Sequence, residues 1–386
     1  MVSHLLLGAL AIGIPYAVLG QSFSLPFRKV QTHGQTVLPP TKTHHRGVAQ
    51  IGEIDEEGFW FTNFTVGASN ELVMLVDTGS CDVYLNPGLY EPSKNSVNEN
   101  DNFTITFETT NPDGSGTLTI DGPIYKDVVS LDNTLLSIAQ MPLGVVTVPL
   151  SPPTFPNDGL VGFSGVSQSA INSSSWFQHL CEEGQLQECR FGIAYQTDDT
   201  GMQYFGYVDE ERFEGPLSVS PVPSEGEWST YMDVAYDGEV LLKDQLMWTD
   251  SGTTVMFGPL EGVQAFFDAA GIQSVLHPST TADVPTTLDG YFSCSNPPTL
   301  GFGIPSISNA SAASRDPHSP VSHMSTIFNV LPSQLVQNST GDNCTASIHG
   351  TDEWPFWLIG QVFFQGKYID HNHDDETMGF AELRSP

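Results

Sequence analysis

A short acidic motif occurs twice in this chain of 386 residues and restricts its fold more than any other feature. The first copy, "VDTGS", places Asp77 at the end of the apolar run Leu72–Val76, and the second, "TDSGTT", places Asp250 173 residues later. Two apolar residues and a glycine follow each copy, in "DGLVGFS" at 158–164 and "FWLIGQVFF" at 356–364. A single tetrapeptide of this kind is an ordinary turn. Two copies in the same context predict an internal duplication, and therefore two similar lobes.

The rest of the sequence favours strands. Gly and Pro are frequent, at 36 and 27 residues, and short runs such as "FTITFETT" alternate or are rich in β-branched residues. The chain is longer than one compact domain usually is. We therefore expect a mostly β, bilobal fold, with an N-terminal lobe at 47–216 and a C-terminal lobe at 217–386.

The start of the chain has the features of segments that are removed. Residues 1–20 are an apolar stretch that ends in small residues, as a secretory signal peptide does. Residues 21–46 are the predicted propeptide, and they contain no Asp or Glu but four basic residues, Arg28, Lys29, Lys42 and Arg46. No later stretch has the apolar length of a membrane span, and the C-terminus has no lipid-anchor signal. We expect a secreted, extracellular protein without a membrane anchor.

The charge of the chain is strongly negative. Lys and Arg number 12 against 45 Asp and Glu, which gives a net charge of −33 at pH 7. Such a chain repels nucleic acid and anionic membranes, so neither is an expected partner. Either the charge serves only to keep the surface solvated, or the protein works in acid, where protonation of its carboxylates reduces the repulsion between them.

The cysteines and glycosylation motifs fit the secretory compartment. Cys181 and Cys189 would close a short loop and Cys294 and Cys344 a longer one, which leaves Cys81 free, although five cysteines alone do not fix the pairing. Each Asn-x-Ser/Thr motif is either a glycan acceptor or an unmodified loop asparagine. The six motifs begin at Asn63, Asn102, Asn172, Asn309, Asn338 and Asn343.

The repeated aspartates carry the predicted chemistry. Equivalent loops of two similar lobes can meet at their interface, and two carboxyl groups in contact share one proton. One carboxylate then acts as a base toward water while its protonated partner polarises a carbonyl group. We expect Ser80 and Thr253 to donate hydrogen bonds to the aspartates of their own motifs. Gly79 and Gly252 let the backbone pass close to the carboxyl groups.

These motifs, together with the closing "GQVFFQGKYIDHNHDDETMGFAEL", resemble those of the pepsin-like aspartic endopeptidases of the secreted, fungal type. The resemblance runs from about Gly47 to the C-terminus. It implies a bilobal β protein whose catalytic residues are Asp77 and Asp250, one from each lobe. It also implies a monomer that acts on protein or peptide substrates without a cofactor or a metal.

The resemblance assigns further roles. Thr78 and Ser251 would cross-brace the two active-site loops, and Cys294–Cys344 would be the disulfide of the C-terminal lobe. The stretch "LPFRKV" at 25–30 is similar to the start of a zymogen prosegment, in which Lys42 would lie over the aspartates until acid releases the leader.

Three positions depart from the family pattern. Cys81 replaces a serine, and we interpret it as a small packing residue because no nearby basic residue would lower its pKa. Tyr84 replaces a tryptophan and keeps a rigid aromatic ring. Phe107 falls at the position of the tyrosine on the hairpin that covers the substrate, the flap, so the ring is kept and the hydroxyl is lost.

Other motifs indicate less. The stretch "DHNHDDE" at 370–376 is interpreted as a polar hairpin turn and not as a metal site. The chain has no Gly-x-Ser-x-Gly motif, which argues against a serine hydrolase. An acid endopeptidase is the leading hypothesis, and the change at Phe107 keeps open a catalytically weak or silent pepsin-like binding or inhibitory protein. A glycosidase with two carboxylates would not explain the repeated motif.

Overall fold

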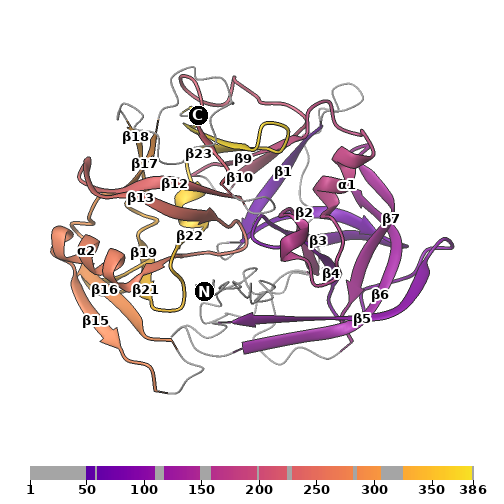
Figure 1. Ribbon diagram of the computed structural model, residues 1–386, viewed down its shortest axis with the longest axis horizontal. Coiled ribbons are helices and arrows are strands. Elements are labelled where there is room, and N and C mark those ends of the chain that lie inside the picture. The colour runs from indigo at the N-terminus through magenta and orange to yellow at the C-terminus, as the bar shows by residue number, and fades with distance from the viewer. Residues whose placement is uncertain are drawn as a thin grey trace, which may run out of the picture.

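The structure is a computed structural model that describes residues 49–56, 59–108, 117–147, 158–197, 200–223, 228–280, 285–305 and 325–384. The predicted signal peptide and propeptide lie outside the described residues. Strands dominate the described part and form two large sheets, one in each half of the molecule, with few helices (Figure 1). The prediction of a mostly β, bilobal fold is confirmed.

The first sheet contains thirteen strands of the described residues, in the order β11-β24-β23-β9-β10-β1-β2-β3-β8-β4-β7-β6-β5. In chain order these are β1 Ala49–Glu56, β2 Phe59–Val66, β3 Ser69–Asp77, β4 Val83–Leu85, β5 Val97–Glu108, β6 Thr117–Leu131, β7 Ser137–Val145, β8 Gly159–Gly162, β9 Arg190–Tyr195, β10 Thr200–Phe205, β11 Ser218–Pro221, β23 Lys367–Asn372 and β24 Thr377–Glu382.

The second sheet contains eleven strands of the described part, in the order β18-β17-β12-β13-β22-β14-β21-β16-β20-β19, with β15 paired to β16. In chain order these are β12 Ser229–Tyr236, β13 Glu239–Thr249, β14 Met256–Pro259, β15 Gln273–His277, β16 Thr287–Ser293, β17 Leu300–Pro305, β18 Ser325–Asn329, β19 Val336–Thr340, β20 Asn343–Ala346, β21 Ile348–Thr351 and β22 Trp357–Ile359. The helices are η1 Val166–Gln168, α1 Trp176–Glu182, α2 Leu260–Ala270 and α3 Gln361–Phe364.

The strand pairing repeats between the two sheets, as the duplicated motif suggests. In the first sheet β3 runs parallel to β8, β8 antiparallel to β4, and β4 parallel to β7. In the second sheet β13, β22, β14 and β21 pair with the same sequence of directions. Asp77 is the last residue of β3 and Asp250 directly follows β13, so the two aspartates occupy equivalent places.

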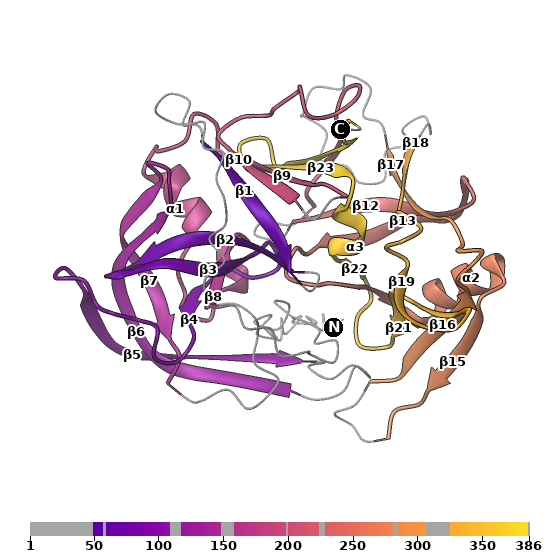
Figure 2. The ribbon, with the colours of Figure 1, turned by 180° about the vertical axis from the view of Figure 1, so that it is seen from behind.

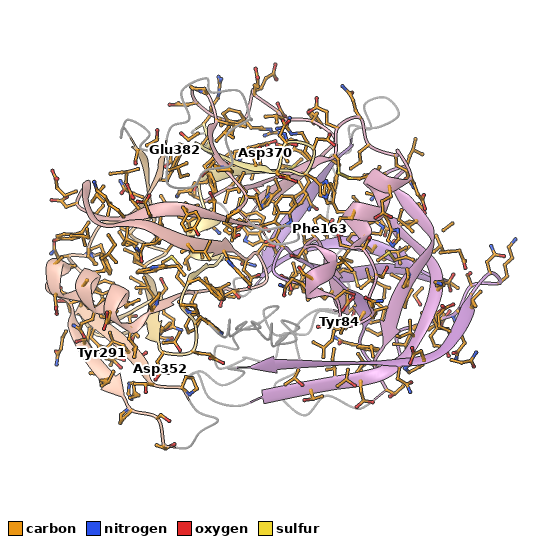
Figure 3. All side chains as sticks on the ribbon, in the orientation of Figure 1. Tyr84, Phe163, Tyr291, Asp352, Asp370 and Glu382 are labelled. Atoms are coloured by element: carbon orange, nitrogen blue, oxygen red, sulfur yellow. A yellow bond between two sulfur atoms is a disulfide. The ribbon has the colours of Figure 1, made fainter. Side chains whose placement is uncertain are left out.

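The first sheet also joins the two halves of the chain. Strand β23 pairs with β9, and β24 pairs with β11, so late segments extend a sheet built by early ones. These strands lie between the two lobes in both ribbon views (Figures 1 and 2). Arg190 on β9 reinforces the junction through Asp370 on β23, with Nη2 to Oδ2 at 2.7 Å and Nε to Oδ1 at 3.2 Å (Asp370 is labelled in Figure 3). A charged pair that is bidentate and largely buried restricts the geometry of both strands.

The disulfide pairing Cys181–Cys189 and Cys294–Cys344 is confirmed, with S–S distances of 2.03 Å in both bonds. Cys81 is free and buried, and burial raises the pKa of its thiol. A thiol that stays protonated is a poor nucleophile. These observations agree with a packing role for Cys81.

Two interpretations of polar stretches need correction. The turn after β23 comprises only residues 373–376, because His371 lies in β23 itself and is fully buried, stacked on Phe191 at 4.3 Å between ring centroids. Asn63 lies in β2 and is 5% exposed, so it is not a loop asparagine and is a poor glycan acceptor. Four other motif asparagines are exposed, namely Asn102, Asn172, Asn338 and Asn343, whereas Asn309 lies outside the described residues.

Candidate active site

Backbone hydrogen bonds connect both aspartates to the buried strands β8 and β22 or to the residue that follows them. The amide of Phe163, which follows β8, donates to the carbonyl of Asp77 at 2.8 Å, and the amide of Asp250 donates to the carbonyl of Ile359 on β22 at 2.9 Å. The apolar pairs of the two downstream motifs form β8 and β22, and both strands are buried along their whole length. These pairs therefore form the floor under the two loops (Phe163 is labelled in Figure 3).

The two loops meet, and the two carboxyl groups hydrogen bond to each other. A Cβ atom added to Gly79 would lie 2.6 Å from Cγ of Asp250, and one added to Gly252 would lie 2.5 Å from Oδ1 of Asp77. No side chain fits at either distance, so the glycines are required for the close approach. Asp77 is 1% exposed and Asp250 is 0% exposed.

Matching donors surround the two carboxyl groups. Gly79 N donates to Oδ1 of Asp77 at 2.8 Å and Ser80 Oγ donates to Oδ2 at 2.6 Å. In the second loop Gly252 N donates to Oδ1 of Asp250 at 2.8 Å and Thr253 Oγ1 donates to Oδ2 at 2.5 Å. Ser80 and Thr253 thus occupy the positions that the sequence predicts for them.

The electrostatics of the pair are not symmetric. Burial raises the pKa of Asp77, but hydrogen bonds from Asp250, Ser80 and Gly79 oppose the shift. Burial raises the pKa of Asp250 well above its usual value, and the charge of Asp77 and the hydrogen bond to it raise the pKa further. Two carboxyl groups in contact cannot both ionise easily, so the pair shares one proton and titrates as a unit.

A reciprocal set of hydrogen bonds fixes the loops to each other. Thr78 N donates to Ser251 Oγ at 3.0 Å, and Ser251 N donates to Thr78 Oγ1 at 2.9 Å. The two hydroxyl groups continue to the opposite strands, with Thr78 Oγ1 donating to Thr249 O at 3.0 Å and Ser251 Oγ to Val76 O at 2.8 Å. The arrangement is the cross-brace that the sequence resemblance implies, and it fixes the separation of the carboxyl groups.

Comparison with known proteins agrees with this geometry. The family model for eukaryotic aspartyl proteases matches residues 59–383. The chain belongs to the eukaryotic aspartyl protease family. An aspartyl protease is a hydrolase, and this chain is accordingly of the aspartic-type endopeptidase class.

Individual relatives of this aspartyl protease are distant but span most of the chain. An aspartic protease of Phaffia rhodozyma is 25% identical over 87% of this chain and 79% of its own length. Secreted aspartyl protease 1 of Malassezia globosa is 26% identical over 88% of this chain and 77% of its own length. Pepsin A of Sus scrofa is 25% identical over 92% of this chain and 90% of its own length.

The two aromatic positions that depart from the family pattern are described unequally. Tyr84 in β4 is buried, and burial and the charge of Asp77 both raise the pKa of its hydroxyl (Figure 3). The backbone of Phe107 pairs with Leu118 in the β5–β6 hairpin, but the structure does not describe its side chain. The predicted place of Phe107 over the substrate therefore stays a prediction.

Three residues near the aspartates are not among those predicted from the sequence. Gln361, the first residue of α3, donates through Nε2 to the carbonyl of Ser251 and is 3% exposed. Trp228 Nε1 donates to Phe163 O at 2.9 Å, which ties the second half of the chain to the end of β8. Asp82 is a further buried carboxylate. Gln361 and Asp82 had a sequence signal, because Gln361 directly follows the "LIG" motif and Asp82 lies two residues after the "VDTGS" motif.

Metal-ligating clusters and membrane-spanning helices are both absent from the described ranges. No group of three or more His, Cys, Asp or Glu side chains there is arranged to hold a metal ion. In the same ranges, no helix has both the length and the apolar character needed to cross a membrane.

Proposed function

We propose that this aspartyl protease is a secreted endopeptidase that hydrolyses peptide bonds in proteins at acid pH, with Asp77 as the general base and Asp250 as the general acid. The observation that carries the proposal is the hydrogen-bonded carboxyl pair, in which the pKa of Asp250 is raised well above its usual value. A carboxyl group that keeps its proton beside a carboxylate supplies both functions at one place.

The proposed reaction has two steps, and each step transfers two protons. Asp77 takes a proton from a water molecule as its oxygen attacks the peptide carbonyl carbon, and Asp250 gives its proton to the carbonyl oxygen. The resulting tetrahedral diol collapses when its carbon–nitrogen bond breaks, the amine nitrogen takes the proton from Asp77, and one hydroxyl returns a proton to Asp250. The pair ends in its starting state, so no cofactor is consumed.

The proton requirement gives the proposed pH dependence. Only the singly protonated pair is active, so activity falls when the pH rises above the raised pKa of Asp250 and both carboxyl groups ionise. Activity also falls when the pH drops far enough to protonate Asp77. The expected profile is a bell with its maximum in acid, which suits the net charge of −33.

Secretion and synthesis as a zymogen are part of the proposal. The support is the apolar stretch 1–20, the acid-free basic segment 21–46 and relatives named secreted aspartic proteases in Malassezia globosa and Candida albicans. Acid would protonate the carboxylates that hold the basic leader, and the leader would then be cut.

An assay on denatured globular protein tests the proposal. Acidified precursor should cleave it, and a peptide inhibitor that mimics the tetrahedral intermediate should stop the reaction. A protein that binds the inhibitor tightly without hydrolysis would instead support the second candidate, a catalytically silent binding protein, which the loss of the hydroxyl at Phe107 favours. Neither cleavage nor inhibitor binding would contradict the proposed function altogether.

A further inference from the structure

Asp82 is a third buried carboxyl group close to the paired aspartates in the chain. It is 5% exposed, and burial raises its pKa. Its carbonyl accepts a hydrogen bond from Gly162 N at 2.9 Å, and the nearby carbonyl of Ser80 accepts one from Ser164 N at 2.8 Å. Asp82 is therefore attached to the same floor strand, β8, that supports Asp77.

Three donors from one distant segment converge on the Asp82 carboxylate. Ser169 Oγ donates to Oδ1 at 2.6 Å and Ala170 N donates to Oδ2 at 2.6 Å, while Ile171 N lies 3.4 Å from Oδ1. An ionised carboxylate accepts all three, whereas an amide would turn its NH2 group toward one of the donors. The carboxylate therefore holds 169–171 more firmly than an amide, which would keep the bond from Ala170 N, turn its NH2 group toward Ser169 Oγ as an acceptor, and lose the charge and the contact with Ile171 N.

This segment packs against apolar side chains beneath the β5–β6 hairpin, which we call the hairpin cluster. Its members are Phe61, Leu75, Tyr84, Phe103, Ile105, Ile120, Ile124, Val146 and Leu160, and Ala170 and Ile171 pack against them. Ile105 and Ile120 are paired across the hairpin itself. Tyr84 lies close enough to Asp77 for the charge of Asp77 to raise its pKa. The cluster therefore connects the segment, the base of the hairpin and the dyad.

We infer that Asp82 is a positioning residue of the proposed protease site, which holds Ser169–Ile171 against the hairpin cluster and so sets how tightly substrate side chains are bound. The inference rests on the proposed function. Asp82 acts through this segment and takes no part in the proton transfers. Its loss therefore affects substrate binding more than the turnover of bound substrate.

The test compares Asp82→Asn and Ser169→Ala with the wild type at one acid pH. Values of kcat and KM are measured with a chromogenic peptide, together with the inhibition constant of an inhibitor that mimics the tetrahedral intermediate. Loss of a hydrogen bond to a charged group predicts that Asp82→Asn raises KM and the inhibition constant about tenfold, with kcat changed by less than about threefold. Ser169→Ala leaves two donors in place and should give a smaller change in the same direction.

Asp127→Asn is the matched control. Asp127 is also fully buried in the N-terminal half and accepts from Ser93 Oγ at 2.6 Å and Ser93 N at 2.9 Å, so it holds a different loop. This variant should lower the melting temperature and leave KM unchanged. The inference is overturned if Asp82→Asn and Ser169→Ala leave KM and the inhibition constant unchanged, if kcat alone falls, or if Asp127→Asn raises KM equally. A wild type that neither cleaves peptide nor binds inhibitor would overturn the proposed function as well.

Discussion

His371 should limit the stability of this protease in acid, and replacing it with phenylalanine should remove that limit. The ring is fully buried, stacked on Phe191 with 4.3 Å between centroids and packed edge-on against Trp228 at 5.1 Å. Neither ring nitrogen makes a hydrogen bond of ordinary geometry, although backbone groups of Ile369 and Phe191 lie nearby. Burial therefore lowers the pKa of His371 to about 3.

The size of the effect follows from the two pKa values. An unfolded histidine takes its proton near pH 6.5, whereas the folded one stays neutral until the pH approaches 3. Between these values the unfolded state binds one more proton, so the free energy of unfolding falls by about 1.4 kcal/mol per pH unit as the pH drops. At pH 4 the loss amounts to about 3 kcal/mol. The His371→Phe variant should escape it and keep the stacking on Phe191.

The assay is urea unfolding followed by tryptophan fluorescence at pH 7 and pH 4. Wild type, His371→Phe and the control His373→Gln are compared in an Asp250→Asn background, which prevents self-digestion. His373 is exposed in the turn after β23, so its variant should follow the wild type. His371→Phe should lose about 3 kcal/mol less than the wild type between the two pH values. Equal losses in all three proteins would refute the reasoning.

Three further predictions concern the hairpin, the cross-brace and the disulfides. Phe107→Tyr should raise kcat/KM several-fold, since one hydrogen bond is worth about 1 kcal/mol. Phe107→Ala should weaken the binding of peptides with large apolar side chains. If both variants have the kinetics of the wild type, Phe107 does not lie over the substrate. Ser251→Ala should remove two hydrogen bonds of the cross-brace, lower the melting temperature and reduce kcat more than it raises KM. An unchanged kcat would contradict the claim that the cross-brace positions the carboxyl groups. Replacing Cys294 and Cys344 by serine should lower the free energy of unfolding by about 4 kcal/mol, because this disulfide closes a loop of 50 residues. Replacing Cys181 and Cys189 should lower it by about 2.5 kcal/mol, because their loop spans 8 residues. Calorimetry that shows the reverse order would contradict this prediction.

The parts of the site that the sequence predicted lie within short motifs. Asp77, Ser80, Asp250 and Thr253 were found because each motif specifies its own local hydrogen bonds, from a side chain to a carboxyl group three residues away. The duplication then indicated that the two loops meet. The Cys294–Cys344 disulfide was expected from the family resemblance, because the five cysteines alone leave the pairing open.

The parts that the sequence did not reveal depend on contacts between distant segments. Asp82 is held by residues 87 to 89 positions later in the chain, and Trp228 reaches Phe163 across 65 positions. His371 looked like a turn residue because its neighbours in the sequence are polar. Pairing of β23 with β9 places it instead inside a strand that is buried along its whole length. Such burial is set by the register of the sheet and has no local signature.

The central claim is that Asp77 and Asp250 act as one catalytic pair. Its most direct test is the kcat of Asp77→Asn and of Asp250→Asn on a chromogenic peptide in acid, with the exposed Asp101→Asn as the control. Each dyad variant should keep the circular dichroism spectrum of the wild type and lose about a thousandfold or more in kcat, while the control keeps its rate. A folded Asp77→Asn or Asp250→Asn protein with turnover close to that of the wild type would contradict the claim.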